Sequence, residues 1–380
     1  MQTIEILNLD DNQVSTLKPD HSQLAPLEQA RRQLEICNAC RYCETYCSVF
    51  PAVHRERAFD DSDVKQLANL CHNCRGCYYA CQYTAPHEFD LNLPQALAKV
   101  RQESWQDNAY PAVFAKAFHK SGAAIGAAVI VGFAALLWLI QLIGSSTANS
   151  PQANFYDMLS HNLMVAIFMP AFLLPLVSIT LSVRRYWRDI GAEPLRFTHI
   201  KSAFASAAKM KNLAAGHGEG CHYEDEDRFS QARRYFHQAT MYGFLLCFAA
   251  TSCATLMHYL FDLVAPYDLN SLPKILGVSG GILLSSGTVG LAYLKSKADK
   301  NLGDTKVWGG EMAFILLLFI VSTSGLLLFG FANSPWLSEL LAFHLGSVLA
   351  FFLLMPFSKM THGFYRLASL IRDEQGKVEK

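Results

Sequence analysis

Charged residues are scarce in this sequence, and neither sign dominates. Only 17% of the 380 residues are charged, and 32 Lys and Arg residues balance 32 Asp and Glu residues. Overall charge therefore gives no sign of a nucleic-acid partner, and we expect none. The first 30 residues also lack the apolar core of a secretory signal, which predicts that the N-terminus stays in the cytoplasm.

The usual sites of substrate chemistry are missing as well. No glycine-rich dinucleotide fingerprint follows a strand, and no set of nucleophile, histidine and acid stands out. We therefore expect no flavin and no catalytic residue on this chain. Any dehydrogenation of a substrate is expected to take place on another protein.

Cysteine, in contrast, is concentrated in two short segments. Eight of the 11 cysteines form two copies of the spacing Cys-x2-Cys-x2-Cys-x3-Cys. By analogy with two-cluster ferredoxins, three cysteines of each run hold one [4Fe–4S] cluster and the fourth binds the neighbouring cluster. The predicted ligand sets are Cys37, Cys40, Cys43 and Cys81 for one cluster, and Cys71, Cys74, Cys77 and Cys47 for the other.

Two other uses of these cysteines fit less well. Structural zinc sites usually combine two Cys-x2-Cys pairs around one ion, rather than a triplet plus one. Disulfides require an oxidising compartment, whereas the topology predicted below places these thiols in a reducing one. The spacing therefore favours two clusters over both alternatives.

Hydrophobic residues make up 51% of the chain and gather in long blocks after residue 122. Each block approaches the roughly 20 residues that a helix needs to cross a bilayer. The predicted spans are approximately 122–143, 160–183, 238–261, 273–294, 310–331 and 339–357. The sequence thus predicts six transmembrane helices and the lipid bilayer as a partner.

The distribution of Lys and Arg predicts the orientation of these spans. The connections 144–159, 262–272 and 332–338 contain no Lys or Arg, whereas 184–237 and 295–309 are rich in them. By the positive-inside rule both termini, and the cysteine runs with them, lie on the cytoplasmic side. The predicted location is the inner membrane of a bacterium.

The cysteine-rich region has almost no period-2 alternation, and a segment such as 62–70 has the pattern of a capped helix. We therefore expect an all-α protein, with an α-helical ferredoxin domain followed by a six-helix transmembrane bundle. The predicted units are a polar tail at 1–30, the ferredoxin domain at 31–110, and the membrane domain at 111–380 with a cytoplasmic loop at 184–236. The stretch 94–105 either rests on the membrane surface or packs on its own domain.

Histidines stand at the ends of the predicted spans. His237 and His362 lie at the cytoplasmic face, and His161, His258 and His344 lie near the opposite face. Haem b between two helices needs two neutral imidazoles at equal depth. We predict one haem on His237 and His362, and a weaker second site on His344 with His258 or His161. Interfacial histidines bonded to headgroups or backbone are the alternative.

Helix periodicity supports this choice. His344 and His362 are 18 residues apart, or about five turns, so they share one helix face roughly 27 Å apart. The segments 233–244 and 355–364 resemble the haem b helices of respiratory nitrate reductase gamma subunits, in which two histidines 18 apart face two histidines 10 apart. Position 247, ten after His237, is Cys247 here, and this departure weakens the second haem.

Nearly the whole chain resembles the tricarballylate utilisation protein B family. The segments 71–77 and 85–94 carry this resemblance in the soluble part. The resemblance implies an electron-transfer subunit that reoxidises an FAD-dependent dehydrogenase, of the tricarballylate dehydrogenase type. Electrons would pass through two [4Fe–4S] clusters and haem b to membrane quinone.

Two other readings remain open from the residues alone. In one, the clusters serve a redox sensor or a transporter, although the spans lack the midplane charges and broken helices expected of a transporter. In the other, the same electron path serves a different dehydrogenase. We expect the Gly-rich loop at 216–222 to be solvated rather than to bind a metal or a quinone, and Glu311 to stabilise a helix N-terminus rather than to carry protons.

Overall fold

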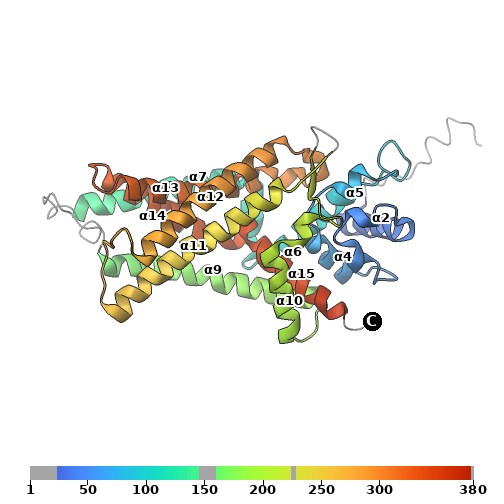
Figure 1. The fold of residues 1–380 in the computed structure, drawn as a ribbon, viewed down its shortest axis with the longest axis horizontal. Coiled ribbons are helices and arrows are strands. Elements are labelled where there is room, and N and C mark those ends of the chain that lie inside the picture. Colours follow the sequence, from blue (N-terminus) through green and yellow to red (C-terminus); the bar gives the residue numbers. More distant parts are fainter. Residues whose placement is uncertain (1–23, 145–159, 224–227, 378–380) are drawn as a thin grey trace, which may run out of the picture.

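The structure is a computed structural model that describes residues 24–144, 160–223 and 228–377. Most of the predicted polar tail, most of the 144–159 connection and the acidic run 224–227 lie outside the described residues. Two parts lie end to end along the long axis of the molecule, with a helical bundle at one end and the cysteine-rich region at the other (Figure 1). The all-α expectation is confirmed.

Short helices surround the cysteine loops. They are α2 (Pro26–Cys40), η2 (Glu44–Tyr46), α3 (Phe50–Val53), α4 (Asp61–Leu70), α5 (Gly76–Tyr79) and α6 (Leu93–Asn108). α2 therefore begins inside the segment predicted as the tail. The predicted capped helix is α4, and its cap is Asp60. The Asp60 carboxylate accepts a hydrogen bond from the Asp63 N–H at 2.9 Å, and the Asp63 carboxylate accepts one from the Asp60 N–H at 3.2 Å.

The bundle contains six long helices. They are α7 (Ala112–Gly144), α9 (His161–Asp189), α11 (Ala232–Phe261), α12 (Leu272–Lys297), α13 (Trp308–Gly330) and α14 (Leu337–Leu354). Among the described residues, five helices are long and apolar enough to cross a membrane. The first predicted span lies in α7, whose apolar part Ala124–Leu139 is shorter.

Small residues let α11 and α12 approach each other closely. A Cβ built on Gly243 would lie 2.4 Å from the Leu284 backbone nitrogen, and one on Gly287 would lie 2.6 Å from that of Thr240. Because lipid supplies no hydrophobic force between helices, such contacts stabilise membrane bundles through van der Waals packing.

The remaining elements lie at the cysteine end of the bundle. α10 (Phe197–Lys209) is followed by η4 (Lys211–Ala214) and by a two-stranded antiparallel ribbon of β1 (Cys221–Tyr223) and β2 (Arg228–Ser230). Short 3-10 helices follow two of the spans: η5 (Lys300–Leu302) and η6 (Thr305–Val307) lie between α12 and α13, and η7 (Met355–Phe357) and η8 (Lys359–Thr361) follow α14. The chain then forms α15 (His362–Gly376), which lies beside α10 (Figure 1).

α15 joins the two parts of the molecule. The Arg372 guanidinium donates to the Asp63 carboxylate on α4 at 2.7 Å, and the fully buried Tyr186 hydroxyl lies 2.6 Å from the Ser369 hydroxyl. Leu370 and Ile371 belong to the same buried core as the helices around the cysteine loops. The core of the cysteine-rich region therefore includes residues from the far end of the sequence.

α6 packs on its own domain. Trp105 is 7% exposed, and its indole nitrogen donates to the Asn69 side chain at 2.7 Å. Of the two alternatives for the stretch 94–105, the structure thus has the packed helix. The exposed aromatic and aliphatic side chains lie just beyond it, at Tyr110, Val113 and Phe114.

Candidate cluster and haem sites

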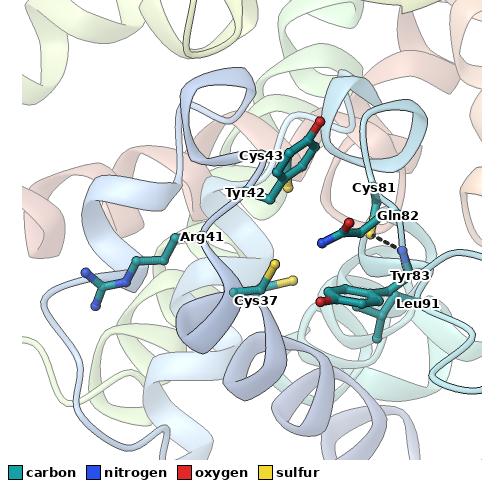
Figure 2. Close-up of a pocket in the computed structure, with 9 residues that line it drawn as sticks. Cys37, Arg41, Tyr42, Cys43, Cys81, Gln82, Tyr83 and Leu91 are labelled. Atoms are coloured by element: carbon teal, nitrogen blue, oxygen red, sulfur yellow. Dashed lines mark hydrogen bonds between the residues drawn. The ribbon is translucent and has the colours of Figure 1, made fainter.

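The first predicted ligand set lies together around one cavity. α2 carries Cys37 and Cys40 and is capped by Arg41, whose φ of 56° redirects the chain toward Cys43. The cavity is lined by Cys37, Cys40, Arg41, Tyr42, Cys43, Cys81, Gln82, Tyr83 and Leu91. Figure 2 shows Cys81 on the segment that faces Cys37 and Cys43, and a dashed line marks the 3.4 Å bond from the Tyr83 N–H to the Cys81 sulfur. All four predicted sulfur donors thus border the same space.

The second predicted set also assembles across the two runs. Cys71 follows the last residue of α4, and Cys77 lies in α5. Cys47 comes from the first run, yet its thiol lies within hydrogen-bonding reach of Cys77. Cys71 and Cys74 are close enough to Cys47 for their charges to interact. Cys47 is also close enough to Cys43 for their charges to interact, so the exchange of fourth cysteines between the two sets stays a prediction.

The donor chemistry fits iron–sulfur ligation. Burial raises the pKa of the Cys37 thiol above its usual range, and the neighbouring thiols raise it further. For Cys43, burial is again the main cause and the nearby Cys81 adds to it, so that its pKa is about 12. Such buried thiols can become thiolates together only when cations balance their charge, as the irons of a cluster would. Among the described residues, no group of three or more His, Cys, Asp or Glu side chains is arranged around a single ion. A cluster has a different requirement, since each sulfur binds a different iron.

The loop at 216–222 is only partly solvated, because Gly216, Gly218 and Glu219 are exposed whereas Gly220 and Cys221 are buried. Gly216 donates its N–H to the Tyr46 carbonyl at 3.3 Å, and a Cβ there would meet the Thr45 carbonyl oxygen at 2.3 Å. Cys221 is 1% exposed and packs in one core with Cys74. The buried end of the loop therefore packs against the second cysteine set.

Arginines gather at the second set. The Cys71 carbonyl accepts hydrogen bonds from Arg101 at 2.8 Å and from Arg366 at 2.9 Å. Arg233 donates to the Asn73 carbonyl at 2.7 Å. Burial, and then the neighbouring Arg101, lowers the pKa of Arg366 to about 9, so this guanidinium still carries its charge at neutral pH.

His237 and His362 meet close to this set. Their ring centres are 5.7 Å apart and the rings are nearly perpendicular, at 78°. Metal–imidazole bonds are about 2 Å long, so two imidazoles that share a metal have nitrogens about 4 Å apart and ring centres farther apart still. The ring centres of this pair are farther apart than 4 Å, as two ligands of one metal require.

The protonation of this pair also fits haem ligation. His362 Nδ1 bonds the Lys359 carbonyl, which leaves Nε2 for a metal, as second-shell bonds usually do. Burial, followed by the charge of Arg366, lowers the pKa of His362 well below its usual value and keeps the imidazole neutral. His237 Nδ1 is buried without a hydrogen-bond partner among the described residues.

The other three histidines are arranged differently. His161 and His258 stack with ring centres 4.2 Å apart, which leaves no space for a metal between them, and His161 also bonds the Tyr259 hydroxyl at 2.9 Å. The Nδ1 atom of His344 lies 2.9 Å from the hydroxyl of Ser324 on α13. The expectation that His344 and His362 share one helix face is wrong, because α14 ends at Leu354 and His362 begins α15. The pairing of His344 with His258 or His161 stays a prediction. Glu311 forms ion pairs with Lys295 and Lys359, in line with a structural role.

Sequence reasoning did not identify the arginines or His72 as parts of this site. His72 lies between Cys71 and Cys74, donates to the Leu70 carbonyl at 2.8 Å, and is close enough to His237 for their charges to interact. One signal was available. Arg233 precedes His237 by four residues and Arg366 follows His362 by four, so each arginine lies one helical turn from its histidine on the same face.

Comparisons with known proteins agree with this architecture. Residues 119–380 match the family model described as citrate utilization protein B, and residues 30–107 match its Fer4-like domain. The chain is 42% identical to citrate utilization protein B of Escherichia coli over 348 residues, which cover 91% of this chain and 92% of that protein. No solved structure matches it. The chain therefore belongs to the citrate utilization protein B family.

Proposed function

We propose that this protein is a membrane electron-transfer subunit. It accepts electrons from an FAD-dependent dehydrogenase, passes them through two [4Fe–4S] clusters and haem b, and delivers them to membrane quinone. The bacterial inner membrane is the proposed location, with the cysteine sets and both termini on the cytoplasmic side. The name of the Escherichia coli relative refers to citrate utilization, so the proposed donor acts on a tricarboxylic acid, with tricarballylate as the first candidate.

One observation carries this proposal: two sets of four cysteines and a histidine pair lie together at one end of an apolar bundle. The second cysteine set and the pair are linked directly, because Arg366 donates to the Cys71 carbonyl one helical turn after His362. Lys and Arg are concentrated in the connections at this same end, which supports a cytoplasmic position. The arrangement suits one-electron transfer from a soluble donor into the membrane.

The roles of the chain's own residues follow from their placement. The cysteines would hold the clusters, which carry one electron at a time, and His237 and His362 would hold the haem. Cys221 of the 216–222 loop packs beside Cys74, and α15 fixes the distance between the cysteine loops and the histidine pair. The overall step balances: the reduced flavin of the partner loses two electrons and two protons, and one quinone gains two electrons and two protons to become quinol.

The test combines cofactor analysis with electron transfer. Protein purified without oxygen should carry about eight cluster irons per chain and show the sharp α-band of bis-histidine haem b after dithionite reduction. Membranes that contain this chain and its flavoprotein should reduce the haem when tricarballylate or citrate is added, and quinone should reoxidise it. Stoichiometric zinc in place of iron, or a haem that no flavoprotein reduces, would contradict the proposal and favour a sensor.

A further inference from the structure

The two cysteine sets differ in the charges around them. Arg101 donates to both the Ala68 and the Cys71 carbonyls, at 3.2 and 2.8 Å. Arg366 donates to the Asn69 and Cys71 carbonyls, at 3.0 and 2.9 Å. Both guanidiniums are only partly exposed, and neither forms an ion pair with a carboxylate among the residues the structure describes. Two unpaired positive charges therefore lie against the loop that carries Cys71.

The first set has no comparable neighbours. Of the nine residues that line its cavity, Arg41 is the one cation. Arg41 is exposed, its Nε donates to the Asn38 carbonyl at 2.8 Å, and its side chain points away from Cys37 in Figure 2. Water screens an exposed charge strongly and a partly buried one much less. Backbone N–H groups donate to a sulfur in both sets, at 3.4 Å to Cys81 and to Cys71, so such bonds are common to the two.

A positive charge stabilises the reduced form of a centre, because reduction adds a negative charge. We propose that Arg101 and Arg366 give the second cysteine set a higher reduction potential than the first. Electrons then enter at the set of Cys37, move to the set of Cys71, and continue to the histidine pair. This inference rests on the proposed function, since both sets must hold clusters.

The position of the two sets supports this direction. Tyr42, beside the first cavity, is 65% exposed, so a partner can approach that set from solvent. The second set packs against Cys221 of the 216–222 loop and lies beside His72 and the histidine pair. Arg101 and Arg366 are positioning residues in this scheme, since they act through the cluster and do not touch the substrate.

The test is a redox titration of the complete protein, followed by electron paramagnetic resonance. Two reduction waves are expected. In Arg101→Gln and in Arg366→Gln, the wave at higher potential should move to a lower potential. At a fixed potential, the ratio of reduced to oxidised centre should change about tenfold. That change corresponds to ~59 mV for one electron, and the lower wave should stay in place.

Arg372→Gln is the matched control. Arg372 lies on the same helix as Arg366 and holds α15 to α4 through Asp63, but it does not contact the cysteine loop. It should leave both waves unchanged, and an equal shift in this variant would overturn the inference. Arg101→Lys and Arg366→Lys keep the charge, so they should keep the higher wave near its original potential even where the Gln variants assemble poorly. A shift as large as that in the Gln variants would also overturn it.

The outcomes separate the two proposals. If the wild-type protein shows no cluster waves, the proposed function fails and this inference fails with it. If it shows two waves that neither Gln substitution moves, the inference alone fails, because the clusters exist without electrostatic control by the arginines.

Discussion

At the scale of single residues, Cys47 and Cys81 have an unusual position, since each lies with the cysteines of the other run. Cys47→Ser should therefore remove the cluster of Cys71, Cys74 and Cys77, while Cys81→Ser should remove that of Cys37, Cys40 and Cys43. Each variant is expected to keep about four of eight cluster irons, which iron analysis and electron paramagnetic resonance can measure.

The control for this experiment is Cys253→Ser, because Cys253 lies in α11 outside both sets. It should keep all cluster iron. If Cys47→Ser instead damaged the cluster of its own run, the exchange of fourth ligands would be wrong.

The histidine pair makes a second prediction at this scale. His237→Ala or His362→Ala should abolish the α-band of reduced haem b, because each removes one of two axial ligands. The control is His54→Ala, since His54 lies on the cysteine-rich domain and pairs with Glu44; this variant should keep the full spectrum.

His344→Ala tests the second haem: loss of about half the haem indicates two haems, and no loss indicates one. Full spectra in both His237→Ala and His362→Ala would refute the assignment.

At the scale of elements, α4 carries the second cysteine loop, and its start depends on the capping box of Asp60 and Asp63. Asp60→Ala removes the side chain that accepts from the Asp63 N–H and should lower the free energy of unfolding by about 1 kcal/mol. The thermal unfolding midpoint of the purified protein should fall accordingly. Glu35→Ala, on the exposed face of α2, is the control and should have little effect. An unchanged midpoint in Asp60→Ala would show that tertiary contacts alone hold the start of α4.

At the scale of the whole molecule, the cysteine sets lie at one end and connect to the bundle through α15, α10 and the 216–222 loop. We expect electrons to pass through both sets before they reach the haem. Cysteine variants of either set should therefore block haem reduction by the flavoprotein and its substrate, while the flavoprotein still reduces an artificial dye. Stopped-flow spectroscopy of the haem band measures this. Haem reduction at a normal rate in variants without clusters would refute the linear order.

The local sequence was sufficient for much of this molecule. Helical spans, the helical nature of the cysteine region and the capped helix α4 depend on hydrophobic periodicity and on side chains that bond nearby backbone, and both are properties of short segments. The cysteine spacing also has a local cause, since three donors at short intervals suit one cluster. The same reasoning placed His237 and His362 at equal depth, because span length fixes the depth of a residue.

Only the tertiary structure decided which distant residues share a site. It placed α15 in the core of the cysteine region, packed Cys221 of the 216–222 loop against Cys74, and stacked His161 on His258, while His344 bonds Ser324. It also brought Arg101 and Arg366, 265 positions apart in the chain, to the same carbonyl of Cys71. Such pairings depend on how helices pack against one another, and a side chain of one helix carries no local signal of the partner that packing will give it.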